Sequence, residues 1–165
     1  MGSTLTVDNI VGATTAANVK LPAGCVLQTV QDVHTGNTTQ SAAGSLSYVT
    51  QQSATITPKY NNSKILIQIF YSWGDSKGAG GGLVPRLQRG STTIAEFNVY
   101  WADSIQTAVY SAAAHDFLDS PATTSAVTYN FQMANQGGTD ILYHNPNYTG
   151  HTNNISTMTL MEIAQ

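Results

Sequence analysis

Residues 64–73 read KILIQIFYSW, and this stretch decides the fold class. Its residues fall into two alternating sets: Ile65, Ile67, Ile69, Tyr71 and Trp73 in one, and Leu66, Gln68, Phe70 and Ser72 in the other. Successive side chains of a β-strand point to opposite faces, so this period of two predicts a strand. Both sets are largely apolar, which is typical of a strand in the interior of a sheet.

The same period recurs along the chain. Residues 127–133 alternate between large apolar and polar side chains, which predicts a strand with one wet face. Strand-forming residues bounded by turn signals predict further strands at Cys25–Val33, Leu46–Thr50, Ala54–Thr57, Leu83–Arg89, Thr92–Asn98, Thr139–Tyr143 and Ile155–Ile163. Pro85 indicates an edge or a bulge in its strand. Many short strands of this kind predict an all-β fold, an antiparallel β-sandwich or jelly roll.

Residues 101–118 fit two patterns. Ile105, Val109 and Ala113 match one face of a helix. Alternation instead places Thr107, Val109 and Ala113 on one side of a strand. We favour the strand.

Composition narrows the classes of function. The 165 residues suggest one domain, and charged residues make up only 9%, where about a quarter is usual. Six Lys and Arg and a net charge of −3 leave no basic stripe, so we expect no nucleic-acid binding. The apolar stretch Ile65–Tyr71 is interrupted by Gln68 and is too short for a membrane helix. The start, MGSTLTVDN, lacks the features of a secretion signal.

The first 24 residues differ in composition from the rest of the chain. Residues 11–24, VGATTAANVKLPAG, are mostly small and cannot bury an apolar face alone. We therefore predict an extended N-terminal arm or stalk, residues 1–24, which needs neighbours, followed by a β-sandwich head at residues 25–165. Cys25, the one cysteine, is expected to be a small buried apolar residue.

Four segments resemble one family of proteins. The segments TLTVDNIVGATTAANVKLPAGCVLQTVQ, SATITPKYNNSKILIQI, FLDSPATTSAVTYNFQM and ISTMTLMEI are similar to small tail-fibre or virion structural proteins of phages of marine and freshwater bacteria, cyanophages included. The similarity runs along nearly the whole chain and is most specific in GATTAANVKLPAG. The chain departs from long-shafted members because its arm starts almost at Met1, which leaves tail, baseplate and capsid open as attachment points.

This resemblance implies a virion component, a homotrimeric fibre or spike that is assembled in the host cytoplasm and exposed on the particle exterior. The arm would contact other virion proteins, and the family supplies no catalytic residues to carry over. In a trimer, three arms would together bury the apolar side chains that one arm cannot bury alone. The candidate trimer contacts are Leu5, Val7, Ile10, Val11, Val19 and Leu21.

The side chains that could act in catalysis or bind a metal do not form a recognisable catalytic or metal-binding pattern. The histidines, His34, His115, His144 and His151, show no short ligand spacing, so we predict no metal and no cofactor. Asp75 and Asp119 lie in turns, where Asp makes local hydrogen bonds, and Glu96 has no obvious carboxylate partner. We therefore predict that the protein is not an enzyme, with a polysaccharide-degrading enzyme as the least favoured alternative.

Aromatic and amide residues in predicted loops are the better candidates for binding. Sugars stack on aromatic faces while amides and hydroxyls fix their hydroxyl groups. The candidate glycan contacts are Tyr100, Trp101, Tyr143, His144, Asn145, Asn147, Tyr148 and His151, and the alternative interpretation is packing at the rim of the sandwich. The function predicted is a fibre or spike that recognises a host-surface glycan or protein without membrane insertion; the alternative is a capsid decoration, cement or head-fibre protein with no receptor role.

Overall fold

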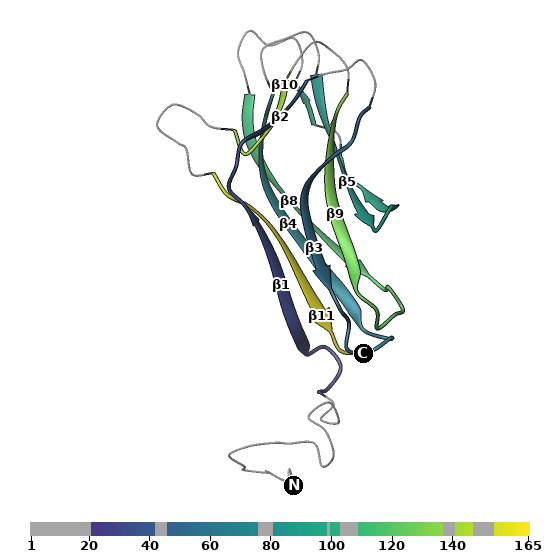
Figure 1. Ribbon diagram of the computed structural model, residues 1–165. Coiled ribbons are helices and arrows are strands. Elements are labelled where there is room, and N and C mark those ends of the chain that lie inside the picture. The colour runs from purple at the N-terminus through teal and green to yellow at the C-terminus, as the bar shows by residue number, and fades with distance from the viewer. Residues whose placement is uncertain are drawn as a thin grey trace.

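A computed structural model describes residues 21–41, 46–75, 81–98, 100–102, 109–136, 141–146 and 154–165. These residues form antiparallel β-strands, and no helix occurs among them. None of them therefore belongs to a helix that could cross a membrane. The strands make two sheets that face each other in an elongated sandwich (Figure 1).

The first sheet has the order β1-β11-β4-β8 across its long strands. Their bounds are Val26–His34 for β1, Ser156–Ile163 for β11, Lys64–Asp75 for β4 and Val109–Asp119 for β8. Two short strands, β10 (Ile141–His144) and β2 (Thr38–Ser41), continue this sheet beside the end of β4. They lie at the end of the sandwich away from the C-terminus (Figure 1).

The second sheet has the order β3-β9-β5-β6. Its bounds are Val49–Ile56 for β3, Val127–Asn135 for β9, Gly81–Arg89 for β5 and Thr92–Glu96 for β6, and β7 (Tyr100–Ala102) pairs with the start of β5. Two sheets with these strand orders are the arrangement of an eight-stranded jelly roll. The prediction of an all-β antiparallel sandwich of jelly-roll type is confirmed.

The core lies between the two sheets. The odd-numbered residues of β4 all point into it, and Tyr71 is fully buried with its ring 4.7 Å from that of Phe131. Thr128, Asn130 and Gln132 of β9 are half-buried, which confirms the wet face predicted for residues 127–133, whereas Ala134 beyond them is fully buried. β4 is interior, as predicted, because β11 and β10 pair with one side of it and β8 with the other. Its outward face nevertheless meets solvent, since Phe70 is 45% exposed.

The sequence misjudged several elements. Residues 49–56 form one strand where two were predicted, and β2 was not predicted. β7 begins at Tyr100, one residue before the segment 101–118 for which a strand was favoured. The described part of residues 101–118 is strand, so the helical alternative is wrong there, while residues 103–108 lie outside the described residues.

Pro85 is not on an edge strand. β5 pairs with β9 on one side, and on the other with β7 up to Leu83 and with β6 from Arg86. Pro85 occupies the break between these two partners, where its carbonyl accepts a hydrogen bond from Phe97 N at 3.1 Å. A residue without an N–H fits there because no ladder bond is lost.

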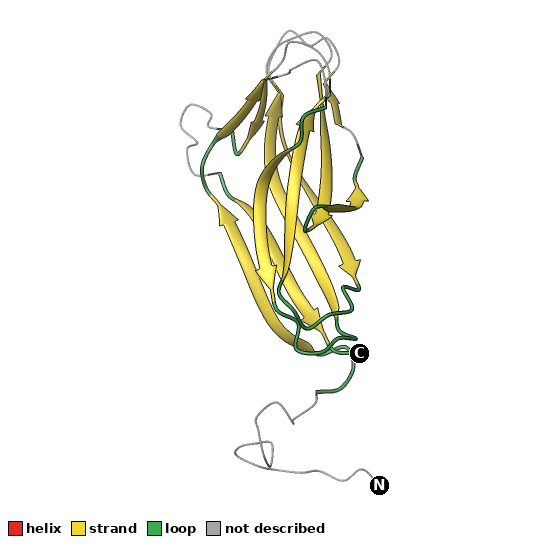
Figure 2. Cartoon of the chain, turned by 45° about the vertical axis from the view of Figure 1, so that its right-hand side comes forward, coloured by secondary structure: helices red, strands yellow, loops and turns green. Residues whose placement is uncertain are grey.

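The N-terminal segment joins the head beside its C-terminus (Figure 2). Gly24 N donates to Ala164 O at 2.8 Å, and Ala164 N donates to Cys25 O at 2.9 Å. Gly24 has a φ of 88°, a conformation that favours glycine. Leu21 is 47% exposed, and the other candidate trimer contacts, Leu5 to Val19, lie outside the described residues.

Candidate functional site

The candidate glycan contacts are only partly described. Tyr100, Tyr143, His144 and Asn145 are described with their side chains, Trp101 only as backbone of β7, and Asn147, Tyr148 and His151 lie outside the described residues. β10 pairs with the end of β4 and β7 with the start of β5, which follows β4 in the chain. Both strands therefore lie at the end of the head away from Leu21 and Gln165, called the distal end below (Figure 1).

His144 is buried, with a side chain only 1% exposed. Its ring centroid lies 4.6 Å from that of His34 on β1. Neither ring nitrogen of His144 has a hydrogen-bond partner among the described residues. Burial and the neighbouring His34 ring lower the pKa of His144 to about 3, so the ring is neutral at physiological pH.

Asn145 is also buried, and it holds the corner that follows β10. Its backbone N donates to Ser72 O at 2.9 Å and its Nδ2 to His34 O at 2.6 Å, while its Oδ1 accepts from Ser156 Oγ. Its φ of 51° lies in the left-handed region, which Asn tolerates better than most residues. The burial of His144 and Asn145 argues against the prediction that they contact a glycan, because their side chains lie inside the head.

Tyr100 belongs to a cluster of rings between the sheets. Its ring lies 5.6 Å from Trp73 and 6.5 Å from His115. His115 accepts or donates a hydrogen bond with Tyr71 at 3.2 Å and stacks on Phe97, with centroids 4.0 Å apart. Burial lowers the pKa of His115, a shift that Asp116 partly opposes, and burial raises the pKa of Tyr71. These contacts correspond to the rim-packing alternative for Tyr100.

Tyr143 lies on the outer face of the first sheet, in a row that the sequence did not reveal. It pairs with Gly74 of β4, and Gly74 pairs with Tyr110 of β8 on its other side. Tyr143 is half-buried and Tyr110 is 45% exposed. A Cβ at position 74 would lie 2.6 Å from Cδ1 of Tyr110, so the glycine leaves room for that ring.

Two tyrosines thus flank a glycine across three adjacent strands. Their Cα atoms are about 10 Å apart, twice the spacing of neighbouring strands. We call Tyr110, Gly74 and Tyr143 the tyrosine row. Two aromatic rings on a flat sheet face offer stacking surfaces for a sugar. A glycine inside a strand pattern often marks close approach, and this signal at Gly74 could have found the row.

Two of the described carboxylates, Asp119 and Glu162, are buried and have several hydrogen-bond donors around them. Asp119 is buried, where it accepts from Arg89 Nη1 at 3.0 and 3.1 Å and from Tyr129 Oη at 2.6 Å, rather than making the local turn bonds predicted. Glu162, which the sequence did not single out, is buried and accepts from Gln28 Nε2 and from the backbone N of Lys59 and Tyr60. Burial alone would raise the pKa of Glu162, but the surrounding hydrogen-bond donors have the larger, opposite effect. The pKa of Glu162 therefore lies below its ordinary value.

The described residues contain no group of three His, Cys, Asp or Glu side chains placed to hold a metal ion. A pocket at the end of the head near the C-terminus is lined by Leu21, Tyr60, Asn62, Ala164 and Gln165. Leu21 is a candidate trimer contact, and here it adjoins the last residues of the chain.

Comparison with known proteins gives matches among solved structures only. No family model and no curated protein matches the sequence. A crystal structure of the infectious bursal disease virus VP2 subviral particle has a TM-score of 0.47 and 11% identity, covering 84% of this chain and 38% of that chain. The Gt strain structure of the same virus gives 0.44 and 11%, covering 85% and 39%. The protein thus spans about two fifths of the length of these chains.

Proposed function

We propose that this protein is a structural component of a bacteriophage virion, the head of a homotrimeric fibre or spike that binds a glycan on the host surface. The chain would attach through residues 1–24 to other virion proteins and would be exposed on the particle exterior. No catalytic step is assigned to it.

The tyrosine row at the distal end is the observation that carries this proposal. The described N-terminal residues enter the head beside its C-terminus, and the row lies at the opposite end (Figure 1). A fibre head that is anchored through its N-terminal segment would present its distal end to the host. The resemblance of nearly the whole sequence to fibre and virion proteins supports the same function.

Adsorption competition tests the receptor role. Purified full-length protein should compete with phage for host cells, and a Tyr110→Ala, Tyr143→Ala double variant should compete at least tenfold less well. Tyr60→Ala is the matched control, because Tyr60 is a half-buried tyrosine at the end near the C-terminus. Circular dichroism would confirm that all variants are folded.

Location on the particle requires a separate measurement. A cryo-EM map of the virion should show the head projecting outward with threefold symmetry. If particles that lack the protein adsorb normally and the purified protein does not compete, the receptor role is wrong and a decoration role replaces it. If the protein is not found on the virion, the whole proposal fails.

A further inference from the structure

β10 carries a residue of the tyrosine row on one face and a buried histidine on the other. Successive residues of a strand point to opposite faces, so Tyr143 lies on the outer face and His144 points into the core. The strand is only four residues long, and it pairs with β4 on one side and with β2 on the other. The surroundings of His144 therefore help to set the position of Tyr143.

These surroundings suit a neutral ring and oppose a charged one. The side chain of His144 is 1% exposed, and its ring centroid lies 4.6 Å from that of His34. Within the part of the chain that the structure describes, neither ring nitrogen of His144 nor Nε2 of His34 has a hydrogen-bond partner. A proton on His144 would place a positive charge beside the His34 ring, with no described hydrogen-bond acceptor to offset its burial.

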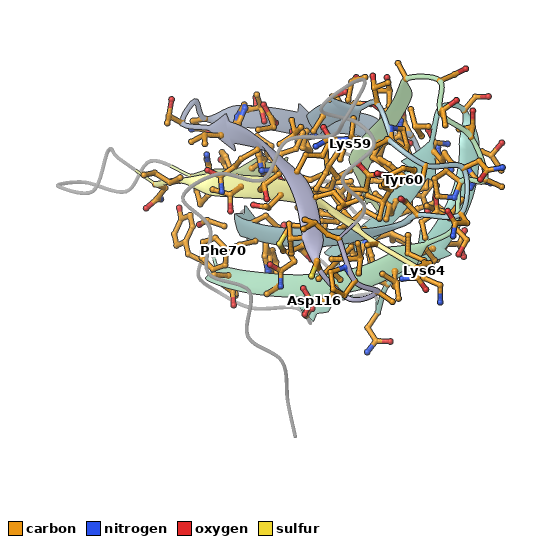
Figure 3. All side chains as sticks on the ribbon, turned by 90° about the horizontal axis from the view of Figure 1, so that it is seen from below. Lys59, Tyr60, Lys64, Phe70 and Asp116 are labelled. Carbon is orange, nitrogen blue, oxygen red and sulfur yellow. The ribbon has the colours of Figure 1, made fainter. Side chains whose placement is uncertain are left out.

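The carboxylates on the neighbouring strands do not pair with these two rings. Asp32, two residues before His34 on β1, accepts a hydrogen bond from the backbone of β3 at 3.3 Å. Asp75 on β4 is buried and lies opposite Leu142 in register, and Asp116 on β8 points to the outside of the sandwich (Figure 3). Among the described side chains, no carboxylate lies within ion-pair distance of either imidazole.

The remaining strands around β10 bring no charge to the histidine pair either. β2 consists of two Thr, one Gln and one Ser, none of which is titratable. Glu162 on β11 and Asp119 on β8 both lie opposite Ile65 at the start of β4, whereas β10 pairs with the last three residues of that strand. Tyr129, the titratable residue of β9, donates to Asp119.

The corner after β10 ties the strand to His34. Asn145 donates from Nδ2 to His34 O at 2.6 Å and from its backbone N to Ser72 O at 2.9 Å. His34 thus contacts this corner through its carbonyl and His144 through its ring. A charged His144 reaches water when β10 moves off this corner, and Tyr143 then moves with the strand.

We infer that His144 is a positioning residue for the tyrosine row: its neutral ring holds β10 and Tyr143 in place, and acid detaches β10 so that glycan binding is lost. This inference rests on the proposed function, because it concerns the regulation of the site assigned there. A four-residue strand suits such a device, since a short element opens more readily than the long strands of the same sheet.

The expected size of the effect follows from proton binding. The pKa of His144 is about 3 in the folded chain, against 6.5 for an ordinary histidine. The attachment of β10 is therefore strongest above pH 6.5 and weakens as the pH falls toward 3, because the detached strand binds the proton and the attached strand does not. The ratio of detached to attached strand should rise by a factor on the order of thirty between pH 7.5 and pH 5.

Amide hydrogen exchange of the full chain, corrected for the intrinsic effect of pH, measures this detachment. The protection of residues 141–144 should fall on the order of thirtyfold from pH 7.5 to pH 5 and should stay below that of β11 at both pH values. His144→Leu should remove this pH dependence, and His144→Phe serves the same purpose if the leucine variant does not fold. His115→Gln is the matched control, because His115 is a part-buried histidine bonded to Tyr71 and lies outside the pair. It should keep the wild-type pH dependence.

Adsorption competition measures the consequence for binding. Wild-type protein and His144→Leu are compared with the same phage and host cells at pH 7.5 and pH 5, so that effects of pH on phage and cells cancel in the ratio of the two proteins. The two proteins should compete equally at pH 7.5. At pH 5 the wild type should compete about fivefold less well than the variant, or worse, because part of its β10 is detached.

Each outcome decides the inference. If β10 loses protection equally in the wild type and in His144→Leu, or if β10 and β11 open together, His144 does not position the row. Competition that is the same for both proteins at both pH values would overturn the inference and leave the proposed function intact. If neither protein competes at pH 7.5, the proposed function is wrong and glycan binding falls with it, whereas hydrogen exchange still decides whether His144 holds β10.

Discussion

Gly74 lies directly beneath the ring of Tyr110, so that a Cβ at this position would meet ring atoms at 2.6 and 2.9 Å and the carbonyl of Val109 at 3.2 Å. The close packing of the neighbouring strands β4 and β8 therefore depends on the absence of a Cβ atom at position 74. The ring of Tyr110 keeps its place over the sheet only while position 74 has no side chain.

Gly74→Ala should displace the Tyr110 ring and weaken the glycan binding that we propose for the tyrosine row. The ring has to rotate away or the strands have to separate, and overpacking of this kind costs about 1–3 kcal/mol of unfolding free energy. Urea unfolding and adsorption competition measure the two effects. Gly36→Ala is the control, because a Cβ there would be 3.8 Å from the nearest atom, an ordinary contact. Equal behaviour of the two variants would contradict the role of Gly74.

Asn145 should stabilise the distal end through its hydrogen bonds. Asn145→Ala leaves buried partners on Ser156 and His34 unsatisfied and strains a residue with a φ of 51°. We expect a loss of about 2–4 kcal/mol, since an unpaired buried polar group costs about 1–3 kcal/mol and strain adds to it.

Asn145→Gly separates the two contributions, because glycine tolerates the backbone conformation but makes no side-chain bond. Its loss should be smaller than that of the alanine variant and still measurable by urea unfolding. If glycine restored full stability, the hydrogen bonds would contribute nothing.

His144 should make the protein less stable in acid. Its pKa is about 3 in the folded chain against 6.5 for an ordinary histidine, so between these values the unfolded chain binds a proton that the folded chain does not. Stability therefore falls as pH drops below about 6.5, by up to about 1.4 kcal/mol per pH unit from this group.

His144→Leu should flatten this dependence, as measured by urea unfolding at pH 7.5 and pH 5. His34 faces the same ring, and His34→Leu provides the comparison for the neighbouring titratable group. An unchanged slope in His144→Leu would assign the acid sensitivity to other groups.

The sequence predicted those parts of the fold that depend on alternation within a strand. β4 and β9 show it clearly, because one sheet face is buried and every second residue must be apolar. β2 escaped prediction because a strand of four residues carries too few alternations, and its pairing with β10 stabilises it rather than its own sequence. Asn145 lies in a bend after β10, as the loop prediction required, but its burial could not be predicted because its partners Ser72, His34 and Ser156 come from distant parts of the chain.

The buried Asp119 should contribute more to stability than either partner. Tyr129 Oη donates to its Oδ2 at 2.6 Å inside the core, and Arg89 binds it with a side chain that is 35% exposed. Asp119→Ala strands the Tyr129 hydroxyl in the core and should cost about 2–4 kcal/mol. Tyr129→Phe leaves the carboxylate with Arg89 and should cost about 1–2 kcal/mol. Arg89→Met should cost least, about 1 kcal/mol, because water replaces a partly exposed guanidinium.

Urea unfolding of the three variants tests this order. A larger loss for Arg89→Met than for Asp119→Ala would mean that the ion pair, and not the buried hydroxyl, holds the end of β8 to the second sheet.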